Sequence, residues 1–96
     1  MYTTKQAIEK RRSIRNFKPD PVPQAHLLEL VESARLAPSG CNAQPWRFKI
    51  VKDDATKRQL KSIAYNQTFL TEAPVVLVIC ADVQGYWTAV LREFRI

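Results

Sequence analysis

Only two segments of this chain have the sequence pattern of a β-strand, and this limits what the chain can fold into. In residues 46–51, Trp46, Phe48 and Ile50 alternate with residues of the opposite face, as in a strand with one face in the core. Residues 75–81, VVLVICA, are a continuous apolar run that predicts a central strand covered on both faces. A sheet of two strands is marginal by itself, so we expect the chain to need more polypeptide, from a partner subunit or a second half.

Helical patterns flank the predicted strands. Thr3 and Gln6 have the spacing of a capping box and predict a short first helix that ends near Arg12. The best-patterned helix follows Pro23, and its apolar residues recur at three- and four-residue spacing, which predicts one broad buried face. This face consists of Leu27, Leu28, Leu30, Val31, Ala34 and Leu36.

Two further helices are predicted nearer the C-terminal end. Residues 54–65 predict a third helix with Leu60 and Ile63 inward and its basic residues outward, and residues 87–94 predict a last one. Gly40, just after the second helix, is available for a left-handed or otherwise unusual backbone conformation. We interpret most basic residues around the third helix as solvated surface, namely Lys52, Lys57, Arg58 and Lys61.

Charge and composition exclude several classes of protein. The net charge of +6 favours anionic partners such as phosphates, nucleotides or nucleic acid. We expect no nucleic-acid partner, because no binding motif is present and the aromatic residues Trp46, Phe48, Trp87 and Phe94 look like core. No apolar stretch approaches the ~20 residues of a membrane helix, and the N-terminus is basic where a secretory signal would be apolar. We therefore expect a cytoplasmic protein without a membrane partner.

The sequence offers little for a metal site or a disulfide framework. His26 is the only histidine, and Cys41 and Cys80 do not form a CxxC pair. Cys41 lies in a polar loop, but no resolving cysteine is near it in the sequence, so we interpret it as incidental rather than as a redox thiol. We therefore expect no metal.

The densest group of ligand-binding side chains lies in residues 10–15, KRRSIR. A phosphate dianion would find planar guanidinium groups and the hydroxyl of Ser13 within six residues. The end of the first helix carries partial negative charge, which the arginines would have to outweigh. The same cations could instead serve only to complement that helix end, and this segment alone does not decide between the two interpretations.

A second polar group lies in residues 37–46, APSGCNAQPW, between a buried helix and a core strand. Its serine and two side-chain amides could form hydrogen bonds with the edge of a flat heteroaromatic ring, which presents both donors and acceptors. Loops held by such scaffolds often carry binding sites. The segment could equally be a connector whose Asn42 and Gln44 satisfy their own backbone.

Taken in order, these motifs resemble the nitroreductase family. They are RRSIRxF, a helix ending in ARLAPS, NxQPWRF and EAPVVLVICAD, and together they cover nearly all of residues 5–83. The resemblance implies an α+β fold with an α-β-α arrangement, in which helices pack on a small sheet completed by dimerisation. It also implies an FMN-dependent oxidoreductase that works as an intertwined homodimer with flavin at the subunit interface.

The resemblance gives the basic segment a role. Arg11 and Ser13 match contacts to the ribityl phosphate, with Arg12 nearby, and Arg15 matches a basic residue near the pyrimidine end of the isoalloxazine ring. A cation there would stabilise the negative charge that develops at N1 and O2 of the flavin.

Other matching residues would reach the flavin from elsewhere. Pro38, Ser39 and Asn42 match a loop that reaches the flavin of the partner subunit. Asn66 or Gln67 could supply an amide to the N3 and O4 edge, and we choose Gln67. Trp46 is interpreted as mainly structural.

The implied reaction passes hydride from NAD(P)H through flavin N5 to a small electron acceptor of the nitroaromatic or quinone type. No catalytic side chain is expected, because the flavin carries the chemistry. Family members are usually much longer than this chain, so we expect residues 1–96 to form a single, truncated nitroreductase-like domain without the C-terminal half. The alternative is a non-enzymatic dimerising module derived from a nitroreductase, which would associate through its exposed strand edges.

Overall fold

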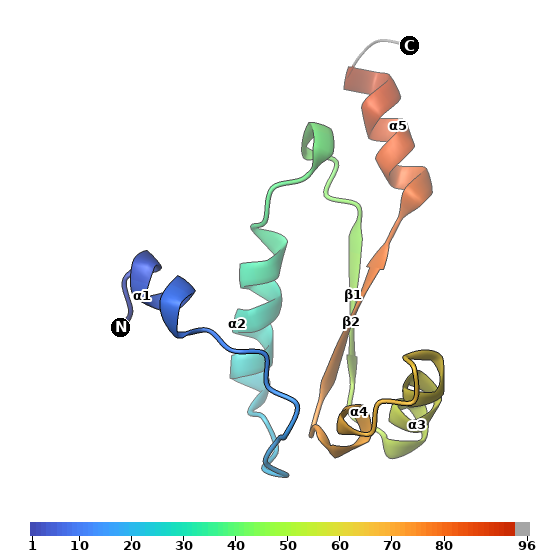
Figure 1. Cartoon of the computed structure of the whole chain (residues 1–96). Helices are drawn as coiled ribbons and strands as arrows, with labels where there is room; N and C mark the ends of the chain where they lie inside the picture. Colours follow the sequence, from blue (N-terminus) through green and yellow to red (C-terminus); the bar gives the residue numbers. More distant parts are fainter. Residues whose placement is uncertain (94–96) are drawn as a thin grey trace.

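An antiparallel pair of strands forms the middle of the fold (Figure 1). The structure is a computed structural model that describes residues 1–93. Strand β1 (Trp46–Val51) pairs with β2 (Val76–Ala81), from Trp46 opposite Ala81 to Val51 opposite Val76. The alternation predicted for β1 is confirmed, because Trp46, Phe48 and Ile50 are half-buried whereas Arg47 and Lys49 are exposed.

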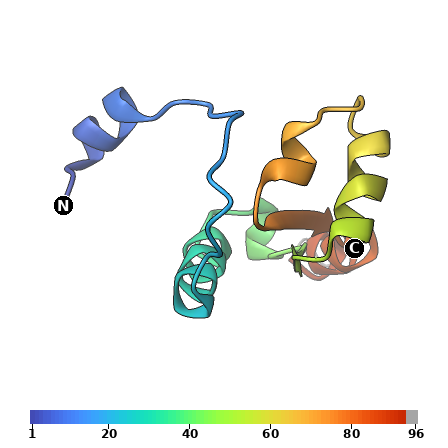
Figure 2. The ribbon, with the colours of Figure 1, turned by 90° about the horizontal axis from the view of Figure 1, so that it is seen from below.

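Helices lie around this strand pair. Figures 1 and 2 show α2 along one side of the strands, α3 and α4 at one end, and η1 and α5 at the other, while α1 stands apart from the rest. The helical elements are α1 (Thr4–Lys10), α2 (Gln24–Arg35), the short 3₁₀ turn η1 (Gly40–Asn42), α3 (Asp54–Ile63), α4 (Phe69–Glu72) and α5 (Val83–Glu93).

The predicted start of the chain is confirmed. The Thr3 hydroxyl accepts a hydrogen bond from the Gln6 backbone N–H at 3.2 Å, and the Thr3 N–H donates to Gln6 Oε1 at 2.9 Å. These two bonds make the capping box, which satisfies backbone donors that a helix start leaves open. Helix α1 ends at Lys10, close to the expected Arg12, and none of its residues is buried.

The broad buried face expected for α2 is only partly formed. Leu27 is fully buried at 0% exposure, and Val31 and Ala34 are half-buried. The other three apolar residues of the predicted face, Leu28, Leu30 and Leu36, are exposed. The sequence pattern predicts burial of this whole face. The strand pair, however, lies along one side of α2 only (Figure 2). An apolar surface therefore remains open on α2.

Strand β2 is likewise not covered on both faces. It starts at Val76, and its last three residues, from Ile79 to Ala81, are exposed. A continuous apolar run predicts coverage on both sides, but coverage depends on a second layer that residues 1–93 do not place over this end of the strand. The chain thus leaves apolar surface on its sheet as well as on α2.

Helix α3 begins as its sequence predicts but ends earlier. The Asp53 carboxylate caps it by accepting from the Thr56 backbone N–H at 2.8 Å. The helix stops at Ile63 because Tyr65 and Asn66 have left-handed backbone conformations, with φ of 58° and 60°. Leu60 is half-buried as expected, but the inward orientation predicted for Ile63 is wrong, since it is 79% exposed at the helix end.

Lys57 is buried, which corrects its interpretation as solvated surface. It is 5% exposed, and its Nζ donates to the Ala73 carbonyl at 2.9 Å and lies 3.3 Å from Asp54 Oδ1. Ala73 is the C-cap of α4 and lies three residues before β2, which begins at Val76. The ammonium group therefore ties α3 to the segment that leads into the second strand.

The last helix begins earlier than predicted, at Val83 rather than Trp87. Asp82 caps it, with Oδ1 accepting from the Gly85 N–H at 2.9 Å. Trp87 is 55% exposed, so its assignment to the core is wrong for this chain. The predicted end at Phe94 lies outside the described residues.

Candidate functional site

The basic segment that follows α1 is extended and open to solvent. Arg11 forms the C-terminal cap of α1, and its N–H donates to the Ala7 carbonyl at 3.1 Å. From residue 12 to the start of α2 the chain has no regular structure, and every residue from 11 to 21 is exposed. No described residue therefore blocks access of a ligand to these side chains.

The cations of this segment have different surroundings. Arg12 Nη1 donates to the Glu9 carbonyl at 3.0 Å and to the Arg11 carbonyl at 2.7 Å. Arg12 thus complements the negative end of α1, one of the two roles open from the sequence. In contrast, the side chains of Arg11, Ser13 and Arg15 make no hydrogen bond or ion pair with the side chains and backbone that the structure describes.

The loop between α2 and β1 is held partly by its own polar groups. The Ser39 Oγ accepts from the Gln44 N–H at 3.0 Å, and Gln44 Nε2 donates to Asn42 Oδ1 at 3.3 Å. Pro38 and Asn42 are exposed and Ser39 is half-buried. The connector interpretation therefore holds in part, although the Asn42 amide nitrogen still faces no described acceptor.

This loop has an unusual backbone at three residues that are not glycine. Cys41, Asn42 and Gln44 have φ of 52°, 50° and 49°, in the left-handed region that side chains disfavour. Gly40 does not use the left-handed conformation that was open to it, because no glycine of the described chain has a positive φ. Gly40 serves another purpose there, since a Cβ on it would lie 3.0 Å from both Cε2 and Oη of Tyr86.

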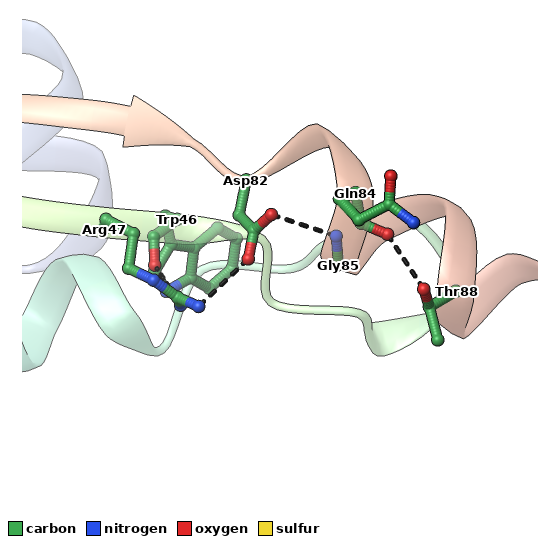
Figure 3. Close-up of polar contacts among 6 residues, drawn as sticks. All are labelled: Trp46, Arg47, Asp82, Gln84, Gly85 and Thr88. Atoms are coloured by element: carbon green, nitrogen blue, oxygen red, sulfur yellow. Dashed lines mark hydrogen bonds and ion pairs between the residues drawn. The ribbon is translucent and has the colours of Figure 1, made fainter.

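The far end of the loop is fastened to the start of α5 (Figure 3). The Asp82 N–H donates to the Pro45 carbonyl. Figure 3 shows the ion pair between Asp82 Oδ2 and Arg47 Nη2, which lie 2.9 Å apart. The other carboxylate oxygen caps α5 through Gly85. Sequence patterns did not reveal Tyr86 or Asp82 as neighbours of this loop, because both contacts join segments about 40 residues apart. The helix predicted for residues 87–94 began too late in the chain to indicate Asp82 as its N-cap.

The third predicted contact lies in the turn between α3 and α4. Asn66 has φ of 60° and its N–H donates to the Lys61 carbonyl at 2.9 Å. The Gln67 side chain is exposed, and its amide makes no hydrogen bond to the residues that are described. An exposed amide on a tight turn is available for recognition of a ligand.

The three parts do not meet within one chain. In Figures 1 and 2 the segment after α1, the η1 loop and the α3–α4 turn lie in different parts of the molecule, the last two at opposite ends of the strands. A separate shallow hollow of about 510 Å³ lies on α2 and is lined by none of the predicted site residues; its lining is Val22, His26, Glu29, Leu30 and Ser33.

Two other classes of site find no support in residues 1–93. These residues hold no group of three or more His, Cys, Asp or Glu side chains placed to bind a metal ion. No helix in the same range is both long and apolar enough to cross a membrane.

Comparisons with known proteins give a consistent result. The model of the nitroreductase family matches residues 8–82. An NADH dehydrogenase of Thermus thermophilus is 52% identical over 80 residues, which are 83% of this chain and 39% of that protein.

Two solved structures resemble the fold. Bacillus megaterium NfrA2 has a TM-score of 0.81 and 32% identity, over 97% of this chain and 38% of that one. An FMN-dependent nitroreductase from Clostridium difficile has a TM-score of 0.73 and 34% identity, over 82% of this chain and 48% of that one. The chain therefore spans less than half the length of each of these relatives.

Proposed function

The chain belongs to the nitroreductase family and has its α+β fold, and on this premise we propose that it binds FMN as part of an NAD(P)H-dependent oxidoreductase. The observation that carries the proposal is the state of Arg11, Ser13 and Arg15. These side chains follow one another on an exposed extended segment and have no partner among residues 1–93. Two guanidinium groups and a hydroxyl fit a phosphate and the electron-rich edge of a flavin.

Each residue of the segment has a distinct part in this proposal. Arg11 and Ser13 bind the phosphate of FMN, and Arg15 places positive charge beside the pyrimidine end of the ring. Arg12 complements the carbonyl end of α1 through Glu9 and Arg11, which lowers the unfavourable field that this end would present to a phosphate. The arrangement supports a phosphate site at a helix C-terminus, where the helix itself would oppose one.

The rest of the site comes from a second copy of the chain in our proposal. The loop around η1, which contains Pro38, Ser39 and Asn42, lies in a different part of the chain from the basic segment (Figure 1). A site shared by the two therefore requires a homodimer in this proposal. The exposed apolar residues of α2 supply a surface that such a partner would cover. Gln67 would reach the flavin edge through its free amide.

The chemistry itself needs no nucleophile from this chain. Bound FMN supplies hydride transfer at N5, between NAD(P)H as donor and an acceptor of the nitroaromatic or quinone type. The residues of the chain bind and orient the phosphate and the ring, and Arg15 stabilises negative charge beside the ring. The Clostridium difficile relative, which is described as FMN-dependent, supports this choice of cofactor.

Fluorescence titration with FMN tests the proposal. We expect FMN fluorescence to change on binding to the protein, and Arg11→Gln to weaken the affinity by about tenfold or more, the value of a charged hydrogen bond. Arg58→Gln is the matched control, because Arg58 is an exposed arginine on α3 in another part of the fold. Absence of any FMN binding by the unaltered protein, or equal losses in both variants, would contradict the proposal.

A non-enzymatic dimerising module is the second candidate. The open apolar surface on α2 and the exposed end of β2 favour it, because monomeric proteins rarely leave such patches uncovered. Light scattering on the purified protein would then show a stable oligomer. The same preparation would hold no flavin and would not oxidise NADH or NADPH.

A further inference from the structure

We propose that Tyr86, on the first turns of α5, is a positioning residue that fixes the loop of residues 39–44 in the backbone conformation with which it contacts the flavin. The proposal rests on the function proposed above and adds a residue outside the segments assigned to the site.

The loop needs external support. Cys41, Asn42 and Gln44 all have φ near 50°, and only asparagine among these three residue types adopts that region readily. Such conformations persist where the surrounding structure determines them, and they concentrate at ligand-binding loops. Four hydrogen bonds lie within the loop: the Gln44 N–H donates to Ser39 Oγ, Gln44 Nε2 to Asn42 Oδ1, the Asn42 N–H to the Ser39 carbonyl and the Ala43 N–H to the Gly40 carbonyl. None of these four bonds is made by Cys41, which has a left-handed backbone and a residue type that disfavours it.

Helix α5 supplies the support from outside. The ring of Tyr86 lies directly over Gly40, so closely that a methyl group at Gly40 would be 3.0 Å from the ring carbon Cε2 and from the hydroxyl. A glycine at this position lets the aromatic ring press against the loop backbone. Residues after Gly40 then turn into the left-handed region.

Tyr86 is itself held in place by the residue that fastens the other end of the loop. Its N–H donates to the Asp82 carbonyl at 3.0 Å, and the Asp82 N–H donates to the Pro45 carbonyl. The Asp82 carboxylate also caps the helix through Gly85, where a side chain would clash with that carboxylate at 2.8 Å. Residues 82–86 thus contact the chain on both sides of the loop, at Gly40 through Tyr86 and at Pro45 through Asp82.

The neighbouring aromatic residue does not share this role. Trp87 packs edge-on to Tyr86, with ring centroids 5.6 Å apart, yet more than half of its surface is exposed. It is a control of the same kind on the same helix, because its removal takes away aromatic area without freeing the loop.

The first test compares FMN affinity among variants of α5. Tyr86→Ala should weaken FMN binding by about tenfold, because part of the binding free energy must then be used to order the loop. Tyr86→Phe should restore the affinity of the unaltered protein, since the ring and not the hydroxyl covers Gly40, and Trp87→Ala should leave it unchanged. Equal affinities in Tyr86→Ala and the unaltered protein would overturn the proposal, as would an equal loss in Trp87→Ala.

A double-mutant cycle tests the contact itself. Gly40→Ala should weaken FMN binding in the unaltered protein, because its methyl group meets the ring of Tyr86. In the Tyr86→Ala background the ring is gone, so Gly40→Ala should cause no further loss. Additive losses would show that the two residues do not act through each other, and would reject the proposed contact.

A readout without flavin separates this proposal from the proposed function. Cys41 is exposed within the loop, so its rate of reaction with a thiol reagent, in a Cys80→Ser background, reports the loop conformation. We expect Tyr86→Ala to change this rate severalfold and Tyr86→Phe and Trp87→Ala to preserve it. An unchanged rate in Tyr86→Ala refutes the positioning role, whatever the flavin affinity.

The combined outcomes are distinguishable. If the unaltered protein binds no FMN, the proposed function fails and the flavin part of this inference fails with it, while the Cys41 rates still decide whether Tyr86 holds the loop. If Tyr86→Ala changes the Cys41 rate but not the FMN affinity, the loop does not contact the flavin. Circular dichroism of each variant identifies any that fails to fold, and Gly40→Ala then tests the contact from the other side.

Discussion

Replacement of Lys57 by methionine should destabilise the protein through one unsatisfied carbonyl. Methionine has an unbranched stem of similar length, so most of the packing survives, but the Ala73 carbonyl loses the donor that lies 2.9 Å away. A buried acceptor left without a partner costs about 1–3 kcal/mol. We therefore expect Lys57→Met to lower the free energy of unfolding by an amount in that range.

Lys57→Ala should cost more by a predictable increment. Compared with methionine, alanine lacks a methylene, a sulfur and a methyl group, together about the size of three methylenes, at a position where the lysine side chain is only 6% exposed. At about 0.8 kcal/mol for each buried methylene, this adds roughly 2 kcal/mol to the loss seen in Lys57→Met. The difference between the two variants thus separates the packing of the stem from the role of the ammonium group.

Asp54→Asn is the matched control for the ion pair. The Asp54 side chain is 79% exposed, and exposed pairs contribute about 0–1 kcal/mol. Urea unfolding followed by circular dichroism, at one fixed protein concentration, measures all three variants. If Asp54→Asn cost as much as Lys57→Met, or if Lys57→Met were neutral, the carbonyl bond would not be the stabilising element and the reasoning would be refuted.

Two further predictions concern helix caps. Asp82→Ala should lower the free energy of unfolding by about 1 kcal/mol, because α5 loses its cap. Arg47→Ala should lower it by less, because the Arg47 side chain of that ion pair is mostly exposed. Urea unfolding that gave the reverse order would contradict this prediction. The hydroxyl and N–H of Thr56 hold the pKa of Asp53 below its ordinary value, so the cap on α3 stabilises fully above about pH 4 and is lost as pH falls through the lowered pKa. Asp53→Asn should flatten that acid dependence in a pH titration of stability, and an unchanged profile would assign it to another group.

Local patterns were enough to predict most elements of the fold. The capping box of Thr3 and Gln6 set the start of α1, and alternation along β1 identified its half-buried face. These features depend on residues close in sequence, so a single chain reveals them. The α+β class is confirmed by the solved relatives.

Coverage of those elements could not be predicted from local patterns. The apolar patterns of α2 and β2 indicate that residues such as Leu30 and Ile79 suit a buried environment. The patterns do not indicate whether other residues of this chain cover them, and both residues are exposed. Lys57 shows the opposite error, because its burial depends on a carbonyl sixteen positions away. Long-range contacts of this kind leave no periodic signal.

The candidate site shows the same division. The sequence located the basic segment and the polar loop. In the structure the Arg12 side chain bonds to carbonyls at the end of α1, whereas the side chains of Arg11 and Arg15 make no bond to the described part of the chain. Their contacts to a flavin, and those of Ser13, Pro38, Ser39, Asn42 and Gln67, stay predictions. The left-handed residues after Gly40 could not be read from composition, since that position was the natural place for a positive φ.

The antiparallel register also has a consequence for the order of folding. Pairing Val51 with Val76 requires the intervening chain to close into a loop, and the contact of Lys57 with Ala73 already joins the two sides of that loop. Contacts close in sequence form at lower entropic cost than distant ones, so the α3–α4 unit should form first and bring the two strands together. Pairing would then proceed from Val51 toward Trp46, and the loop that receives Tyr86 would be the last part of the chain to reach its native conformation.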